Sequence, residues 1–295
     1  MFKAIRARYL VRKGRQLLLD AKYEEALRVL EKVRKIFPGW PPAYINIGNC
    51  YFHLNNKEKA LEYINRALNI EPGNELALFN KAIVLNNSER NEEALAIVEE
   101  LVVKNNNDTN YRKMHGMVLY QLKQYENAIR SVEELMRLEG QSTGSQIIIA
   151  LCYSKLGDRD SSIRAYDKLL ELDPHDASAW NNRGFQYNVV GNYEEAIKNF
   201  DQSISIEPDF AYPFNNRGYA YLKMGNPEQA IKDIDHSLQL DPDNSYAYKN
   251  KAHYFLAISE KAKAREQLLK AASLGFAKQY GSEVDELLKQ LDENS

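Results

Sequence analysis

The chain contains 295 residues, of which 44% are hydrophobic, and its formal net charge at pH 7 is −2. This near-neutral balance excludes a uniformly basic nucleic-acid-binding protein, and no apolar run is long enough to span a bilayer. A single globular core stops growing at about 250–300 residues, so the length favours an architecture in which each part contacts only its neighbours.

The first sixteen residues interleave basic with apolar side chains. No apolar segment follows them, so they do not have the pattern of a signal peptide. We expect them to form the first helix, on which no preceding element covers four apolar residues: Phe2, Ile5, Tyr9 and Leu10. These side chains are expected to pack on the helix of residues 23–36. The alternative is that they dock a partner or a second copy of the chain.

Small residues recur at intervals of 34 along almost the whole chain. One series consists of Ala26, Ala60, Ala94, Ala128, Ser162, Ala196, Ala230 and Ala264. A second consists of Gly14, Gly48, Ala82, Gly116, Ala150, Gly184, Gly218 and Ala252. A fixed period of this length indicates a stacked repeat protein. Eight repeats fit without an insertion, at residues 7–40, 41–74, 75–108, 109–142, 143–176, 177–210, 211–244 and 245–278.

Each repeat is predicted to be a pair of helices. Two stretches with the apolar spacing of a helix follow one another, and a turn marked by Gly157, Gly191 or Gly225 separates them in the most regular repeats. The second stretch ends at a proline in five repeats, because proline cannot continue a helix interior. The small residues of the two series let the paired helices approach closely, and large ones such as Trp180 and Phe200 fill the space beside them.

Repeats three and four depart most from this pattern. Asn106 and Gly140 replace the final proline, and Glu89 and Lys123 replace the glycine of the turn. We therefore expect irregular curvature or flexing here. After the eighth repeat, residues 282–292 carry one apolar stripe and are predicted to form a C-terminal helix that covers the last repeat, within a terminal segment of residues 279–295.

The period, the two small positions, the large residues and the prolines together resemble the tetratricopeptide repeat family over nearly the whole chain. The resemblance implies an all-α fold, a right-handed superhelix (an α-solenoid) of antiparallel helix pairs with a C-terminal capping helix. It also implies that the first helix of each pair lines a concave groove. In the family, six positions of each first helix face the ligand, which gives 48 groove positions in this chain.

The sequence gives little indication of catalysis, and we predict neither enzymatic activity nor a cofactor. It has no phosphate-binding glycine loop and no metal-binding CxxC or HExxH spacing, and the five histidines are scattered, so no metal site is expected. Cys50 and His53 are three residues apart on one helix, but packing explains Cys50 better than nucleophilic chemistry. Cys50 and Cys152 are three repeats apart, too far for a disulfide, which favours a reducing, cytoplasmic setting.

Asparagine recurs at one groove position, where a carboxamide both donates and accepts hydrogen bonds and can hold an extended peptide. Apolar and aromatic residues occupy other groove positions. The candidate peptide-binding residues are Asn46, Asn80, Asn182, Asn216, Asn250, Met114, Ile148, Phe185, Tyr212, Tyr219 and Tyr246. The alternative is that the asparagines are solvated helix residues typical of the family, and that the apolar residues fill a tight part of the superhelix.

The predicted groove is positively charged. Its 48 positions contain seven lysines and arginines but no aspartate or glutamate. The groove therefore has a charge of +7, and the rest of the chain has a charge of −9. The candidate anion-binding residues are Arg8, Arg12, Arg15, Lys113, Lys155, Lys223 and Lys249. A positive cleft raises the local concentration of an anionic partner. Alternatively, the family's architecture simply places acids on the second helices.

Three functions follow as hypotheses. The first is an adaptor that binds an extended, partly acidic segment of another protein in the groove. The second is a scaffold that assembles a complex through its outer face or its N-terminal end, and that end is also where self-association is expected. The third is binding of nucleic acid or anionic lipid through the basic groove, which the asparagine runs and the apolar stretch disfavour.

Overall fold

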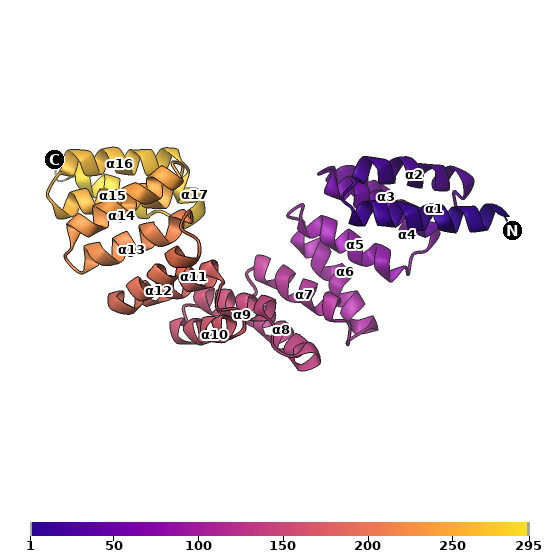
Figure 1. Ribbon diagram of the computed structural model, residues 1–295, viewed down its shortest axis with the longest axis horizontal. Coiled ribbons are helices and arrows are strands. Elements are labelled where there is room, and N and C mark those ends of the chain that lie inside the picture. The colour runs from indigo at the N-terminus through magenta and orange to yellow at the C-terminus, as the bar shows by residue number, and fades with distance from the viewer. Residues whose placement is uncertain (1, 294–295) are drawn as a thin grey trace. The chain divides into compact units, whose positions relative to one another are not determined.

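The computed structural model describes the backbone of residues 2–293 and the side chains of residues 8–293. Within that range the regular structure is entirely helical, and the chain forms two compact units, Met1–Gln141 and Ser142–Ser295 (Figure 1). The boundary between the units lies after Gln141, next to Gly140, which is one of the residues that interrupt the repeat pattern. The side chains of Phe2 and Ile5 lie outside the described residues.

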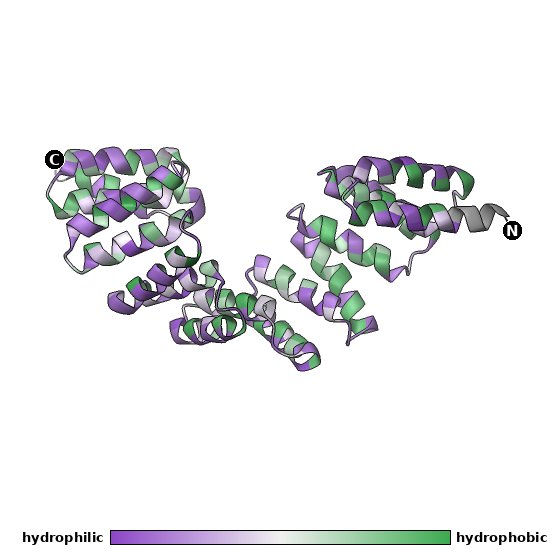
Figure 2. Cartoon of the chain, in the orientation of Figure 1, coloured by the Kyte–Doolittle hydropathy of each residue, from purple (hydrophilic) through white to green (hydrophobic). Residues whose placement is uncertain are grey.

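The first unit contains eight helices among its described residues, and each packs against the next. They are α1 (Phe2–Leu19), α2 (Tyr23–Ile36), α3 (Pro41–His53), α4 (Lys57–Ile70), α5 (Glu75–Asn86), α6 (Asn91–Lys104), α7 (Thr109–Gln121) and α8 (Tyr125–Glu139). Figure 2 shows hydrophobic and hydrophilic residues alternating around these helices, as expected where one face packs and the other meets water.

The second unit repeats the arrangement and adds two C-terminal helices. It contains α9 (Thr143–Leu156), α10 (Arg159–Leu172), α11 (Ala177–Val189), α12 (Tyr193–Ile206), α13 (Ala211–Lys223), α14 (Pro227–Leu240), α15 (Ser245–Ala257), α16 (Lys261–Ser273), α17 (Phe276–Tyr280) and α18 (Glu283–Glu293). Each unit is therefore an α-solenoid of helix pairs.

The small residues allow the two helices of a pair to touch. A Cβ atom added to Gly184 would lie 2.7 Å from Cε1 of Phe200, and one added to Gly48 would lie 2.7 Å from Cγ1 of Ile64. Neither distance is tolerated between carbon atoms. The core consists of such contacts repeated along each unit, with the alanines of the other series fully buried, as at Ala60 and Ala196.

The turn inside each pair has one backbone conformation throughout. Gly157, Gly191 and Gly225 have a left-handed φ of 81°, 81° and 75°. The residues at the same position in the other repeats also adopt a left-handed φ, between 55° and 64°: Ala21, Asn55, Glu89, Lys123 and Ser259. The loss of glycine at Glu89 and Lys123 therefore leaves the turn unchanged. At both residues the Cβ atom lies close to the following carbonyl oxygen, which strains the backbone.

The predicted C-terminal helix is present as α18, which packs against α16. Its Val284 and Leu291 are buried against Leu268 and Phe276. The short helix α17 is not predicted by the sequence pattern. Phe276 begins it, at the position where other repeats carry proline, and is fully buried.

The division into eight repeats stays a proposal. Helices α1–α16 lie in pairs along the predicted ranges, but α1 begins at Phe2, before the predicted start at residue 7, and α17 runs across the predicted end at residue 278.

Candidate functional site

The first helices of the pairs, α1, α3, α5 and α7 in the first unit and α9, α11, α13 and α15 in the second, present one surface in each unit, which we call the first-helix face. In the first unit α1 contacts α3, α3 contacts α5 and α5 contacts α7. In the second unit α11 contacts α13 and α13 contacts α15. The predicted groove residues lie on these helices, so their exposure decides which of them can meet a ligand.

Two of the predicted asparagines connect neighbouring helices rather than facing solvent. Asn216 Nδ2 donates to Asn181 Oδ1 at 2.9 Å, which joins α13 to α11. Asn250 Nδ2 donates to Asn215 Oδ1, also at 2.9 Å, which joins α15 to α13. Asn250 is fully buried, so its assignment to peptide binding is wrong. The carboxamides here hold successive repeats in register.

The remaining asparagines differ in their surroundings. Asn46 donates to the carbonyl of Pro42 in its own helix at 2.7 Å, and Asn80 is buried with no partner for its Nδ2 among the described residues. Asn182 is half-buried and accepts a bond from Asn181. Asn46 and Asn182 are therefore the ones whose carboxamides a ligand can reach.

A pocket of about 310 Å³ opens on the first-helix face of the second unit. Five predicted residues converge on it: Phe185, Asn216, Tyr219, Lys223 and Tyr246. Asn188, Val189 and Tyr193 complete the lining and were not among the candidates. The sequence could have identified Asn188 and Val189, because both fall on ligand-facing positions of the repeat. It offers no such indication for Tyr193.

The polar groups of this pocket, which we call the aromatic pocket, have unused bonding capacity. Asn188 is 6% exposed; its Nδ2 donates to the main-chain carbonyl of Asn216, and its Oδ1 has no partner among the described residues. The Nζ of Lys223 lies 5.3 Å from the centre of the Tyr219 ring and forms no ion pair within the described part of the chain. Burial raises the pKa of Tyr246 to about 12, so its hydroxyl stays protonated and can donate.

Lys249 is not a free anion-binding residue. It is 3% exposed, and its Nζ lies 3.1 Å from Oε2 of Glu283, at the start of α18. His253 Nε2 lies 3.5 Å from the other oxygen. The hydrogen bond from His253, together with the charge of Lys249 and against the effect of burial, lowers the pKa of Glu283 to about 2. The carboxylate that pairs with Lys249 therefore comes from the protein's own C-terminal helix and not from a ligand.

A second pocket, of about 340 Å³, lies at the N-terminal end of the first unit. Arg8, Arg12 and Arg15 line it together with Trp40, and no acidic residue takes part. All three arginines are exposed and none forms an ion pair among the described side chains. We call this the arginine pocket. Guanidinium groups in this state match carboxylate or phosphate oxygens in a bidentate manner.

The other candidates are dispersed. Met114 is buried in the core with Val98 and Val118, so it is not a surface anchor as predicted. Lys113 forms an ion pair with Glu139 at 3.0 Å. Ile148 is half-buried, and Tyr212 and Lys155 are exposed outside both pockets.

Cys50 and His53, the one nucleophilic pair that the sequence offers, have separate surroundings. Burial raises the pKa of the Cys50 thiol to about 12, and His53 stacks on Tyr23 with ring centres 4.9 Å apart. The side chains of Cys50 and Cys152 are both fully buried. In the described part of the chain no group of three metal-ligating side chains occurs, and no described helix has the length and apolarity needed to cross a membrane.

Family models of the tetratricopeptide repeat match residues 41–74, 144–176, 165–198 and 211–244, and a TPR repeat model matches residues 190–225. The first and last of the tetratricopeptide ranges coincide with two of the predicted repeats. Among curated proteins, Tetratricopeptide repeat protein 6 of Homo sapiens is 35% identical over 60 residues, which is 20% of this chain and 12% of the relative.

Solved structures share the fold at low sequence identity. A chain of the APC/C hetero-tetramer Cut9–Hcn1 is similar with a TM-score of 0.64 and 16% identity, over 96% of this chain and 55% of that one. A tetratricopeptide repeat protein from Parabacteroides merdae is similar with a TM-score of 0.56 and 20% identity, over 97% of this chain and 98% of that one. This chain therefore spans about half the length of the first of these structures and a small part of the human relative.

Proposed function

Since the chain belongs to the tetratricopeptide repeat family, we propose that it is a protein-interaction adaptor that binds an extended, partly acidic segment of another protein on its first-helix face. The observation that carries this proposal is the aromatic pocket, where residues from three successive first helices meet. The pocket combines large rings, which dominate interface energetics, with one unpaired ammonium and one buried, unpartnered carboxamide oxygen.

The chemistry of the aromatic pocket specifies complementary groups on the partner. The rings of Phe185 and Tyr219 favour an apolar or aromatic side chain. Lys223 favours a carboxylate beside it. The Oδ1 of Asn188 lacks a donor, and a main-chain N–H of an extended segment provides one, which removes the cost of a buried unsatisfied acceptor.

The arginine pocket supports the acidic character of the partner. Its three guanidinium groups form no ion pair with any described side chain, and Trp40 gives the lining an apolar side. The two pockets lie in different units, and each is proposed as a contact region in its own right. Lys249 and Asn250 do not take part, because the protein's own Glu283 and Asn215 already engage them.

The test uses charge-reversal variants with matched controls. Lys223→Glu combined with Phe185→Ala alters the aromatic pocket, and Lys232→Glu on α14 reverses an exposed charge away from it. Arg12→Glu combined with Arg15→Glu alters the arginine pocket, and Arg28→Glu on α2 is its control. Proteins that co-purify with each variant are compared with those of the unmodified chain, after circular dichroism has established equal helix content.

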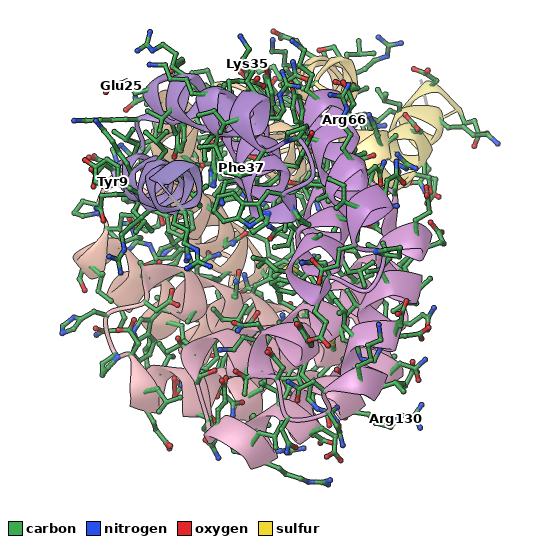
Figure 3. All side chains as sticks on the ribbon, turned by 90° about the vertical axis from the view of Figure 1, so that its right-hand side faces the viewer. Tyr9, Glu25, Lys35, Phe37, Arg66 and Arg130 are labelled. Atoms are coloured by element: carbon green, nitrogen blue, oxygen red, sulfur yellow. The ribbon has the colours of Figure 1, made fainter. Side chains whose placement is uncertain are left out.

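The adaptor proposal predicts that a partner is lost with a pocket variant and kept with its control. If every partner is retained by both pocket variants, the first-helix face is not the working surface. The scaffold function then takes precedence, with the N-terminal end as its surface, because Tyr9 is 63% exposed there (Figure 3). Self-association through that end is part of the same alternative. Binding of nucleic acid or anionic lipid would show as sequence-indifferent binding with a steep salt dependence.

The compartment belongs to the proposal as well. The buried, unoxidised thiol of Cys50 fits a reducing, cytoplasmic setting, and we infer that the adaptor meets its partner there.

A further inference from the structure

Successive helix pairs of the second unit are connected by an arginine bridge. Arg183 on α11 donates to Asp167, sixteen residues earlier, at 2.5 Å, and to Asn199, sixteen residues later, at 2.7 Å. The guanidinium therefore joins the second helix of the preceding pair to the second helix of its own pair.

The next pair repeats this bridge. Arg217 donates to Asp201 at 2.5 Å and to the carboxylate of Asp233 at 2.7 and 2.8 Å. Burial on its own lowers the pKa of Arg217, but the hydrogen bonds from the guanidinium to Asp233 and Asp201 raise it above its ordinary value. A guanidinium with two acceptors sixteen residues away on either side is thus a recurring element of the fold.

The first unit contains the same arrangement with the guanidinium missing. His115 on α7 occupies the position of Arg183 and Arg217. Ser131, sixteen residues later, lies with its Oγ 2.9 Å from His115 Nδ1, and Glu99 stands sixteen residues earlier. Glu99 forms no ion pair within the described residues, and burial lowers the pKa of His115, an effect that the charge of Glu99 opposes. A neutral imidazole has taken the place of a cation.

A pocket of about 370 Å³ is present at this place. Glu99, His115 and Ser131 all line it, it lies between the second helices α6 and α8, and it shares no lining residue with the aromatic and arginine pockets. The rest of its lining consists of Arg112, Leu119, Gln124, Asn127, Arg130 and Glu134. Figure 3 shows Arg130 at the periphery of the unit.

We propose that this pocket, which we call the Glu99 pocket, binds the guanidinium group of an arginine side chain from a partner protein. The partner's arginine would occupy the place that Arg183 and Arg217 fill in the second unit. The acceptors are the unpaired carboxylate of Glu99 and the hydroxyl of Ser131, in the arrangement that engages a guanidinium in the two bridges. A planar fork reaches two separated acceptors, which a point-charge ammonium does not match.

The two arginines of the lining do not make the pocket an anion site. Arg112 is bonded to both the carbonyl and the side chain of Asn106, and Arg130 donates to Asn127. Their charges lower the affinity for a cation, so the pocket contributes selectivity within a larger contact rather than tight binding on its own. Removing the charge of Arg130 is therefore expected to strengthen the binding of a guanidinium and would weaken that of an anion.

The experiment titrates the full chain with blocked glycyl-arginyl-glycine and follows backbone amide shifts by nuclear magnetic resonance. The same peptide with lysine or with citrulline in place of arginine provides the controls for shape and for charge. We expect millimolar binding of the arginine peptide, with shifts around Glu99 and Ser131, and about tenfold weaker binding of the other two, as loss of a charge-assisted hydrogen bond implies.

Four variants complete the test. His115→Arg fills the pocket with the chain's own guanidinium and is expected to abolish binding. Glu99→Gln is expected to weaken it about tenfold, Glu92→Gln on the same helix to leave it unchanged, and Arg130→Gln to strengthen it. Equal binding by wild type and His115→Arg, equal binding of the citrulline peptide, or loss of binding in Arg130→Gln overturns the proposal. None of these outcomes bears on the first-helix face.

Discussion

Lys249 on α15 and Glu283 on α18 form an ion pair of 3.1 Å across 34 residues of sequence, one full repeat. The ammonium group of Lys249 is almost completely buried, and its Nζ lies 4.1 Å from the centre of the Tyr246 ring. It therefore contacts both an aromatic ring and the Glu283 carboxylate. This pair explains how a lysine that sequence position assigns to a ligand groove becomes part of the protein's own interior. The ion pair also connects the C-terminal helix α18 to α15, the first helix of the last repeat.

Replacing Glu283 is expected to destabilise the second unit. Half of its side chain is exposed, so solvent screening limits the cost of Glu283→Gln to about 1 kcal/mol. The folded pKa of about 2 lies below the ordinary 4.5. The contribution is therefore complete above pH 4.5 and is lost as the pH falls toward 2. Urea unfolding across that range measures it, and Asp285→Asn, an exposed charge on the same helix turn, is the control. If wild type and Glu283→Gln differed in unfolding free energy by the same amount at pH 7 and at pH 2, the ion pair would not be the source of the stability.

Two turns are predicted to gain stability from glycine. Glu89 and Lys123 both have φ near 60°, where an L-residue is strained by about 1–2 kcal/mol. The greater chain entropy of glycine in the unfolded state offsets part of the gain. Glu89→Gly and Lys123→Gly should each raise the free energy of unfolding by about 0.5–1 kcal/mol.

The converse substitution is the control for the turns. Gly191 has φ 81° and no atom close to an added Cβ, so Gly191→Ala tests backbone strain alone and should cost about 1 kcal/mol. Thermal unfolding distinguishes the three variants. Stabilisation by Gly191→Ala would show that the left-handed turn is not retained in solution.

The asparagine bonds between first helices are predicted to be energetically coupled. Asn215→Ala and Asn250→Ala should each cost about 1–2 kcal/mol, because each leaves a buried polar group without its partner. The double variant should cost less than the sum of the two. Asn46→Ala is the matched control, since the hydrogen bond that Asn46 donates lies within its own helix. Strict additivity in the Asn215 and Asn250 cycle would rule out the bond as a source of stability.

The thiol of Cys50 is expected to be inert in the folded chain. Burial holds its pKa at about 12, so the thiolate needed for alkylation is scarce at neutral pH. Reaction with a thiol reagent should follow the rate of unfolding and rise sharply in denaturant. Rapid modification under native conditions would identify Cys50 as a reactive residue and reopen the pairing with His53.

The helix pairs and their turns could be predicted because they depend on residues close in sequence. Each repeat is determined by its own apolar spacing, the proline at its end and the small residue where its two helices touch. The same pattern recurs every 34 residues, so each repeat supports the prediction for the others. The turn at Lys123 shows the limit of this approach. A missing glycine suggested irregularity, but the packing of the two flanking helices imposes the left-handed turn whatever side chain is present.

The candidate sites could be predicted only in part. Position within the repeat identified Phe185, Tyr219 and Lys223, which the aromatic pocket does bring together. The same rule placed Asn250 in the groove, where the structure buries it. Exposure differs between equivalent positions because it depends on the neighbours in the adjacent repeat, such as Asn215, and these lie 35 residues away in sequence.

The sequence by itself determined the all-α repeat architecture of this protein, since a short-range pattern repeated at constant spacing leaves one way to bury its apolar faces. The tertiary structure alone decided which charges are free. Arg217 and Lys249 are neutralised by acids brought close through helix packing, whereas Arg12 and Lys223 have no ion-pair partner in the described part of the chain. Ion pairing depends on distances of a few ångströms between side chains on different helices, and those distances exist only in the folded chain.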